Sequence, residues 1–466
     1  MTNVLGGELD ELRAAVAGSA LVPGEAGYDD ARRVWNGQID RRPSLVVVCA
    51  GPADVSAALA HAHRAGLAVT VRGGGHNTSG SEVNDGGLMI NFSRLNAVTV
   101  DPEARRARVG GGALLSDLDA ATQAHGLATP GGMISHTGVA GLTLGGGMGW
   151  LTRRHGLSVD NLVGAEVVLA DGRVVRADAD EHPDLFWALR GGGGNFGAVT
   201  ELEFALHELD PMVNLGFLFW EIERGAEALR CIRGVVPTLS REFNVLIAAM
   251  SAPPMPFVPE EHHGRPGVAV LFPGFGSPES HAEALRAFGV ESAPLVEFAS
   301  PIPYPALQQL VDEPNRWGQC AYEKGTQLAE LTDETIDVLI ERLSRRGSAR
   351  SQVLLYRLDG AFSEVDEDAT AYGGGRTPRY AAMLVGIAED LAGWEAERAW
   401  VRDLWSALQP HSLGVGDYIN SMVEFEQERI VASYGPDKYQ RLAQIKARYD
   451  PGNVFRSNAN IRPAQG

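Results

Sequence analysis

Four runs of glycine in the first half of the chain are the residues best suited to hold an anionic ligand. Because glycine has no Cβ, its backbone N–H groups can approach an anion closely. A tight turn between strands explains any single run. Together the runs predict a cradle for a long phosphate-containing ligand such as a dinucleotide. They are Gly73-Gly74-Gly75, Gly110-Gly111-Gly112, Gly145-Gly146-Gly147 with Gly149, and Gly191 to Gly194 with Gly197.

Two familiar nucleotide-binding motifs are not satisfied. Gly192, Gly194 and Gly197 match the spacing GxGxxG, but residues 199–206 alternate like a strand, whereas that fingerprint requires a helix at this point. The phosphate loop GxxxxGK[ST] does not occur in the sequence. These observations argue against a nicotinamide-type Rossmann site and against a P-loop.

Strands and helices alternate around the glycine runs. An apolar stretch at residues 45–49 precedes a helical pattern that Gly66 ends, and a second apolar strand at residues 67–71 leads into the first run. Residues 98–109 predict two paired strands, and residues 114–125 predict a helix. This order predicts two layered lobes.

The pattern changes after about residue 210. Up to about residue 414 the glycine runs thin out, and segments such as 243–250 and 353–358 are typical of sheet strands. Residues 330–345 predict a helix between them. A further helix at residues 439–449 precedes an extended tail. The middle of the chain is therefore expected to form a separate domain.

The composition is that of a globular protein, with 466 residues, 44% hydrophobic and 21% charged, and a formal net charge of −19. This length suggests two large domains. The negative charge would repel nucleic acid and anionic lipid, so we expect no nucleic-acid or membrane partner but a small molecule. The beginning of the chain has no leader pattern and residues 9–16 predict an amphipathic helix, so we expect a cytoplasmic protein, either monomer or homodimer.

Cysteine and histidine patterns do not predict a metal site. Three cysteines are too few and too scattered for a disulfide framework or a thiolate site. His61 and His63 lie two positions apart on a predicted helix and cannot share a face. His262-His263 has only the two preceding glutamates nearby. We therefore expect no metal.

Specific motifs surround the glycine runs and resemble a known family. Residues 137–161 resemble the second FAD loop, and residues 185–200 the third, of the berberine bridge enzyme family in the vanillyl alcohol oxidase and p-cresol methylhydroxylase (PCMH) superfamily. Tyr418-x-Asn420 and residues 449–461 resemble the closing segment of that family. Its first FAD loop is matched by Arg72-Gly73-Gly74-Gly75-His76-Asn77 with Ser79-Gly80.

The resemblance covers about residues 25–208 and 415–463 and is closest to bacterial members of the family. It implies an α+β fold, with a two-lobed PCMH-type FAD-binding domain and a substrate domain whose antiparallel sheet is covered by helices. We assign residues 1–208 to the FAD-binding domain and residues 209–414 to the substrate domain. Residues 415–466 are expected to return to the FAD-binding domain.

The resemblance implies covalent FAD on His76, because the family bonds the histidine of its RGGGH motif to the flavin 8α-methyl carbon. A neutral imidazole can add to that carbon while the glycine amides hold the pyrophosphate. Many relatives make a second bond through a cysteine four residues before the glycine equivalent to Gly138. Ile134 occupies that position, so we expect one covalent bond. The candidate cofactor-binding residues are Arg72, Gly73, Gly74, Gly75, His76, Asn77, Ser79, Gly80, Gly132, Thr137, Gly138, Gly141, Gly145, Gly146, Gly147, Gly149, Asn161, Val199, Tyr418, Asn420 and Asn458.

Three side chains are candidates for catalysis. Tyr418 is the first, as a base, because the matching family tyrosine lies over the flavin face; ordinary packing is its alternative role. Glu364 is the second, because its segment resembles the one that supplies the family's catalytic glutamate. Residues 372–376 depart from the family's FPHR pattern, which leaves a solvated surface role open for Glu364. Thr137 occupies a position that lines the approach of oxygen to the flavin, where it either hydrogen-bonds an oxygen species or merely packs.

These features favour a flavin oxidase or oxygenase that acts on a small secondary metabolite, alkaloid or sugar with molecular oxygen as acceptor. A flavin dehydrogenase that passes electrons to another carrier is the alternative. A non-catalytic protein that binds a phosphorylated ligand in the glycine loops is the third hypothesis. The substrate is expected to be set by the middle domain, where the resemblance is loose.

Overall fold

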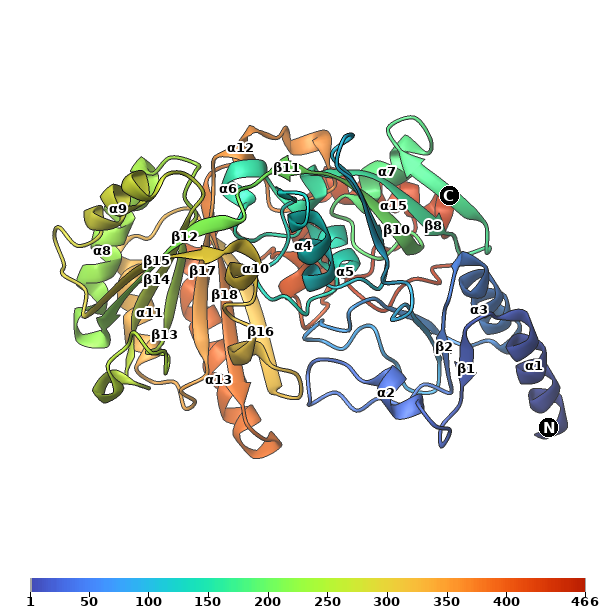
Figure 1. Cartoon of the computed structure of the whole chain (residues 1–466). Coiled ribbons are helices and arrows are strands. Elements are labelled where there is room, and N and C mark those ends of the chain that lie inside the picture. Colours follow the sequence, from blue (N-terminus) through green and yellow to red (C-terminus); the bar gives the residue numbers. More distant parts are fainter. Residues whose placement is uncertain (1, 466) are drawn as a thin grey trace.

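A computed structural model describes residues 2–465, with side chains from residue 7 onward. Two small sheets, one large sheet and a two-stranded ribbon carry the chain, with helices packed on their faces (Figure 1). The α+β fold expected from the sequence, with two lobes and a helix-covered antiparallel sheet, is confirmed.

The first lobe is a four-stranded sheet in the order β1-β2-β4-β3, in which β4 runs parallel to both of its neighbours. Its apolar strands pack against α3, which begins at Pro52 and ends before Gly66, where φ is +64°. Residues 45–71 thus form the predicted strand, helix and strand. The elements are α1 (Thr2–Ala15), β1 (Ser19–Leu21), α2 (Tyr28–Arg32), β2 (Leu45–Val48), α3 (Pro52–Ala65), β3 (Val69–Arg72) and β4 (Leu88–Asn91).

The second lobe is a five-stranded antiparallel sheet in the order β5-β6-β10-β8-β9. β10 begins directly after Gly197, so a strand and not a helix follows the GxGxxG spacing, as the sequence predicts. The ribbon pairs β7 with β11. The elements are β5 (Val98–Asp101), β6 (Arg106–Gly110), α4 (Leu115–Gln123), β7 (Leu127–Ala128), α5 (Val139–Gly145), α6 (Thr152–His155), β8 (Leu162–Val168), β9 (Val174–Asp178), α7 (Pro183–Leu189), β10 (Ala198–Ala205) and β11 (His207–Glu208).

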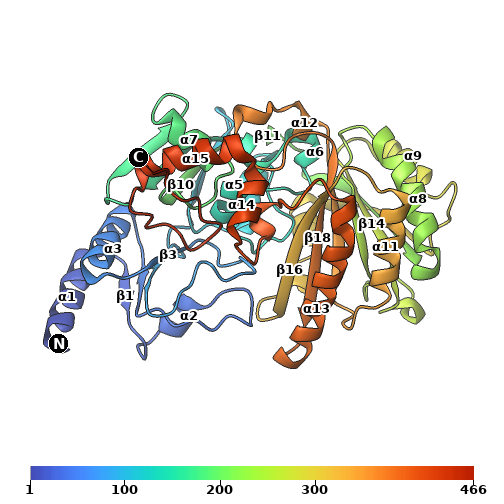
Figure 2. The ribbon, with the colours of Figure 1, turned by 180° about the vertical axis from the view of Figure 1, so that it is seen from behind.

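The large sheet has seven antiparallel strands in the order β15-β12-β14-β13-β17-β18-β16. Helices α8, α9, α11 and α13 cover one face (Figure 2). Because the pleat alternates, Ile247 packs beneath these helices while Leu246 and Ala248 face the opposite side. The elements are β12 (Met212–Glu221), α8 (Gly225–Val235), β13 (Leu246–Ser251), β14 (Pro266–Gly274), α9 (Pro278–Ala287), β15 (Val296–Pro303), α10 (Tyr304–Gln308), β16 (Cys320–Leu328), α11 (Asp333–Leu343), β17 (Gln352–Leu358), α12 (Ala361–Glu364), β18 (Arg379–Ala388) and α13 (Leu391–Leu408).

The closing segment lies against the second lobe, where α14 (Gln427–Tyr434) is followed by α15 (Pro436–Tyr449) and α15 packs on α7 (Figure 2). The buried Lys446 fastens this segment. Its Nζ donates to the carbonyl oxygens of Asn195 at 2.5 Å and Phe455 at 2.8 Å, and it pairs with Asp450 at 2.6 Å. The loop of the fourth glycine run, at residues 191–197, and the tail are therefore held by one ammonium group.

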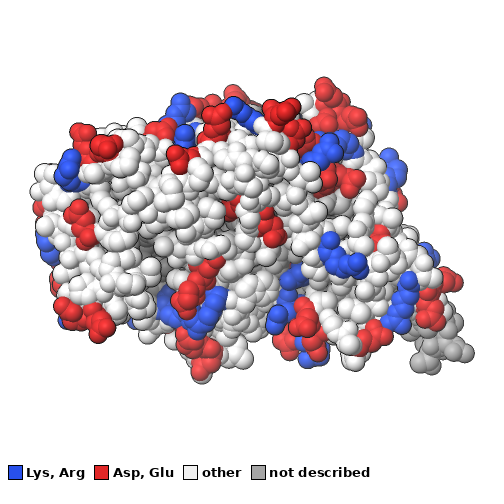
Figure 3. All heavy atoms as spheres, viewed as in Figure 1, with Lys and Arg blue, Asp and Glu red and all other residues white. Residues whose placement is uncertain are grey.

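Acidic and basic side chains intermix on the face shown in Figure 3, chiefly near its edge. None of the helices within residues 2–465 combines the length and the apolar character needed to cross a membrane. The same residues contain no cluster of histidine, cysteine and carboxylate side chains spaced to bind a metal.

Candidate functional site

A cavity of about 670 Å³ lies between the glycine loops and the large sheet. Loop residues 73–77, segments within 132–148 and residues around 193–199 line one part of it. Side chains of the large sheet line another part, and Tyr418 and Asn420 come from the segment before α14. The fold thus brings together motifs that lie far apart in the sequence.

Most of the predicted cofactor-binding residues line this cavity. A Cβ added to Gly74 would lie 2.4 Å from Cα of Gly138, so the first and second loops touch backbone to backbone. A Cβ on Gly141 would meet nothing within 4 Å, so the missing side chain leaves open space for a ligand. The lining residues are Gly73, Gly74, Gly75, His76, Asn77, Gly132, Thr137, Gly138, Gly141, Val199, Tyr418, Asn420 and Asn458.

The remaining predicted cofactor-binding residues are not among those that line the cavity. A Cβ on Gly145 would lie 2.0 Å from Asn420 Oδ1, and one on Gly149 would lie 2.0 Å from the carbonyl oxygen of Gly131, so these glycines permit contacts between chain segments. The amide of Asn161 donates to backbone carbonyls of its own turn at 2.8 and 2.9 Å. The predicted residues outside the lining are Arg72, Ser79, Gly80, Gly145, Gly146, Gly147, Gly149 and Asn161.

His76 faces the cavity at the end of the first glycine loop. Trp35 stacks on its ring with centroids 4.9 Å apart, and its Nε2 lies 3.1 Å from Nδ1 of His136. Burial and the neighbouring His136 lower the pKa of His76 to about 3. The imidazole is therefore neutral and nucleophilic at neutral pH, and Nδ1 bonds to no described side chain.

Tyr418 lines the same cavity with its hydroxyl oxygen fixed by two donors. The backbone N–H of Gly147 donates to it at 2.9 Å and the side-chain amide of Asn420 at 2.7 Å. Both donors stabilise a phenolate, but burial is the larger effect and raises the pKa of Tyr418 above its ordinary value. Tyr418 is thus held in place and protonated at neutral pH.

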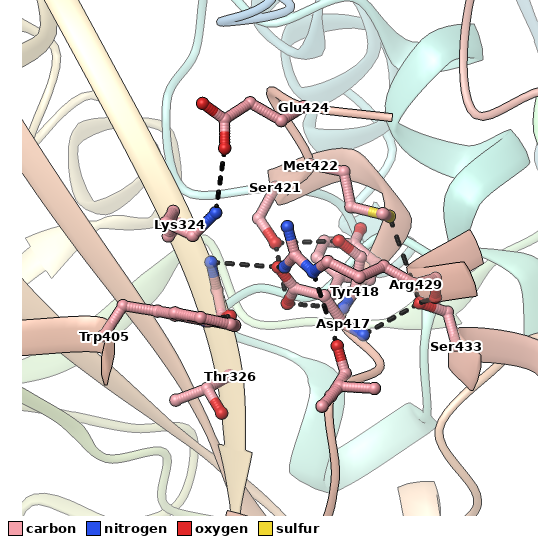
Figure 4. Close-up of polar contacts among 12 residues, drawn as sticks. Lys324, Thr326, Trp405, Asp417, Tyr418, Ser421, Met422, Glu424, Arg429 and Ser433 are labelled. Carbon is pink, nitrogen blue, oxygen red and sulfur yellow. Dashed lines mark hydrogen bonds and ion pairs between the residues drawn. The ribbon is translucent and has the colours of Figure 1, made fainter. Parts of the chain in front are cut away.

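Asp417 holds the backbone of Tyr418 against the large sheet (Figure 4). Its carboxylate accepts hydrogen bonds from the backbone N–H groups of Gly325 on β16 at 2.9 Å and of Tyr418 at 2.7 Å. The carboxylate also pairs with Arg429 of α14 at 3.5 Å, and burial raises the pKa of Asp417 to about 6. The segment that carries Tyr418 is consequently fixed to both the sheet and the closing helices.

Glu364 does not belong to the site. It lies exposed at the end of α12, where its carboxylate pairs with the exposed Arg241 at 3.0 Å. It is not among the residues that line the cavity. The prediction of a catalytic Glu364 is therefore wrong, and the solvated surface role is the one observed.

The second loop brings Thr137 and Ile134 to the cavity. No cysteine lines it within the described part of the chain, because Cys49, Cys231 and Cys320 are buried elsewhere and free. The position from which many relatives form a cysteinyl bond is thus filled by a hydrocarbon side chain.

The wall formed by the large sheet is mostly apolar. Register places Glu323, Val385 and Gln352 in one row across three strands. Tyr356 lies four residues beyond Gln352 on β17, opposite Leu246. Glu323, Gln352 and Tyr356 supply the polar side chains of this wall within the described residues. An apolar ligand with few hydrogen-bonding groups suits such a surface.

Sequence reasoning missed three residues of the site. His136 directly precedes Thr137 in the second loop, so its place in a matching motif was a usable signal. Trp35 comes from an irregular segment, and its position over His76 depends on the packing of two distant segments. Glu323 carried no signal, because only the register of β16 shows which face its side chain takes.

The loop part of the cavity fits FAD. Thr70, Glu82 and Asn458 line it and have buried side-chain oxygens without a protein partner. Buried polar atoms need hydrogen-bond partners. The hydroxyl groups of a ribose can donate to the oxygens of Glu82 and Asn458, and a pyrophosphate oxygen can accept from the Thr70 hydroxyl. With the open space at Gly141, these atoms form a polar cradle beside His76.

Comparison with known proteins places this flavin-type site in a family. Family models match residues 43–178 as an FAD binding domain and residues 417–462 as berberine and berberine like. (R)-6-hydroxynicotine oxidase of Paenarthrobacter nicotinovorans is 31% identical, over 96% of this chain and 97% of its own. The chain belongs to the berberine bridge enzyme-like FAD-linked oxidases of the PCMH superfamily and is an oxidoreductase.

Solved structures agree with this assignment. 6-Hydroxy-D-nicotine oxidase from Arthrobacter nicotinovorans superposes with a TM-score of 0.86 at 28% identity, covering 96% of this chain and 98% of that one. A glucooligosaccharide oxidase from Acremonium strictum, described with 6-S-cysteinyl, 8α-N1-histidyl FAD, gives 0.84 at 22% identity, covering 98% and 100%. The latter similarity shows the fold alone.

Proposed function

We propose that the chain is an oxidase that carries FAD on His76 through one covalent bond and transfers electrons from a small organic substrate to oxygen. The observation that carries the proposal is a neutral imidazole at the end of a glycine loop, facing a cavity that fits FAD. The named activity of (R)-6-hydroxynicotine oxidase and the histidyl flavin of the glucooligosaccharide oxidase support it.

FAD, when bound, accepts a hydride from the substrate and returns the electrons to oxygen. The residues of the chain would position the cofactor and the substrate, shield the substrate from water and move protons. The glycine loops would hold the pyrophosphate, and the apolar wall of the large sheet excludes water from the substrate. In its phenolate form Tyr418 is placed to receive a substrate proton, and Gly147 and Asn420 stabilise that form by donating hydrogen bonds to its oxygen.

An oxygen-consumption screen across alcohols, amines, sugars and diketones tests the proposal. We expect one class to cause oxygen uptake, and the same compounds to bleach the flavin absorbance when oxygen is excluded. A substrate that reduces the flavin anaerobically without oxygen uptake in air would instead support the dehydrogenase hypothesis.

Thr137 is expected to govern the reaction with oxygen. Thr137→Val removes a hydroxyl at nearly constant size, and Thr137→Leu adds bulk at the same position in the cavity wall. We expect reoxidation of the reduced flavin to slow in the first variant and to slow further in the second, while anaerobic reduction persists in both. Stopped-flow reoxidation measures this effect, and equal rates in all three proteins would show that oxygen enters elsewhere.

A further inference from the structure

The carboxyl group of Glu323, in the large-sheet wall of the cavity, has no partner of opposite charge among the described residues. Glu323 is 7% exposed, and its Oε2 accepts a hydrogen bond from the Thr78 hydroxyl at 3.1 Å. Its Oε1 is buried without a partner, and no ion pair to Glu323 occurs within residues 2–465. The neighbouring Lys324 pairs with Glu424 at 3.1 Å instead.

The surroundings of this carboxyl favour a cation. Burial raises the pKa of Glu323 to about 8, and the charged group that acts on it, Asp417, has the same sign and raises the pKa further. A buried carboxyl group without a counter-ion is costly to ionise, and a ligand that supplies a positive charge removes most of that cost.

Glu323 stands at one edge of an apolar wall. β16 is an edge strand of the large sheet, and the neighbouring strands contribute Val385, Met383 and Leu354 to the same wall. A sugar bound here would leave most of its hydroxyl groups without partners. A ligand with a hydrocarbon body and one positive charge suits this surface, because the body can pack on the apolar wall while the charge lies at the Glu323 carboxyl.

The carboxyl is also fixed relative to the loop that carries His76. The buried amide of Asn36 donates to the carbonyl oxygens of Thr78 at 2.7 Å and Ala321 at 3.0 Å, which ties this loop to β16. Because Thr78 also bonds directly to Glu323, the carboxyl keeps a constant position beside the proposed flavin attachment.

We propose that Glu323 binds the protonated nitrogen of the substrate and that the substrate is an apolar, cationic amine. The inference rests on the proposed function, because it takes the sheet side of the cavity as the substrate site. Glu323 thereby sets substrate specificity, while its Thr78 hydrogen bond orients the carboxylate toward the bound nitrogen.

Calorimetric titration of the holoenzyme with two probes of similar shape tests this role. N,N-Dimethylbenzylamine is protonated at pH 7.5, whereas N,N-dimethylbenzamide is neutral. We expect the wild type to bind the amine at least about tenfold more tightly than the amide. Glu323→Gln should abolish this preference, because it should weaken the binding of the amine and leave the binding of the amide unchanged. Glu313→Gln, which changes an exposed carboxylate that also lines the cavity, should preserve it.

Equal affinities for the two probes in the wild type, or a preference that survives in Glu323→Gln, would overturn the proposal. Glu323→Asp withdraws the carboxylate by one methylene group, so it should show a reduced preference even if the glutamine variant does not fold. An unchanged preference in Glu323→Asp also contradicts the proposal. Calorimetry does not depend on the flavin, so flavin content and oxygen uptake, measured on the same samples, report separately on the proposed function.

Discussion

Replacing Tyr418 by phenylalanine is expected to slow flavin reduction by the substrate by about 10²- to 10⁴-fold, the usual contribution of a positioned acid or base. The exchange keeps the buried ring and removes the hydroxyl that Gly147 and Asn420 hold. Anaerobic stopped-flow absorbance measures the rate. Flavin content should remain that of the wild type, because the hydroxyl is not part of the proposed attachment.

The pH dependence of the same rate identifies the role of the hydroxyl. The base form of Tyr418 is its phenolate, and burial raises the pKa, so the phenolate fraction at neutral pH is small and grows as the pH rises. We therefore expect flavin reduction to accelerate from pH 6 to 9 by up to about tenfold per pH unit. Tyr418→Phe should lose this dependence on Tyr418 ionisation.

Tyr372→Phe is the matched control. Tyr372 is buried with its ring centroid 6.3 Å from that of Tyr418, but it does not line the cavity. Its loss of a hydroxyl should leave reduction near the wild-type rate. Near-normal reduction in Tyr418→Phe, or equal slowing in both variants, would assign Tyr418 to packing.

Replacing Lys446 by methionine is expected to lower the free energy of unfolding by about 3–5 kcal/mol. The variant leaves the carboxylate of Asp450, whose side chain is fully buried, without its counter-ion. It also removes the donor to the carbonyl groups of Asn195 and Phe455. The loop at residues 191–197 should loosen together with the tail. Urea unfolding followed by circular dichroism measures the change.

Arg448→Met on the same helix is the control for this effect. Arg448 pairs with Asp184 at 2.9 Å, but its side chain is 68% exposed, so water screens the pair and we expect a loss of at most about 1 kcal/mol. Equal losses in the two variants would show that the buried ammonium does not fasten the closing segment.

The parts of the site that follow from local motifs could be predicted from the sequence. His76, Tyr418 and Asn420 lie on the cavity because each belongs to a short segment that the fold places as a unit. The strand, helix and strand at residues 45–71 also followed from local periodicity. Such features depend on neighbours within a few residues, which the sequence displays directly.

The roles of several glycines could not be predicted in this way. Gly74 and Gly145 look alike in the sequence, yet Gly74 lines the cavity and Gly145 makes room for Asn420. The glycine runs predict one long ligand, but some of their glycines instead make room for close contacts between distant segments. Which role applies depends on what packs against each glycine.

The positions of side chains that depend on long-range pairing could not be predicted from the sequence either. Glu323 reaches the cavity because β16 pairs with β18 in one register, and a shift by one residue would turn it to the helix-covered face. The position of Glu364 also depends on distant parts of the chain. The path of the chain after β17 carries Glu364 to the surface, where it pairs with Arg241.

The attachment of FAD to His76 is tested most directly by acid precipitation of the purified protein, followed by mass spectrometry of its tryptic peptides. We expect the flavin to remain in the pellet and to be found on the peptide that contains His76, with no flavin on any cysteine peptide. His76→Ala should release its flavin into the supernatant. Wild-type protein that releases all of its flavin on precipitation would contradict the covalent bond.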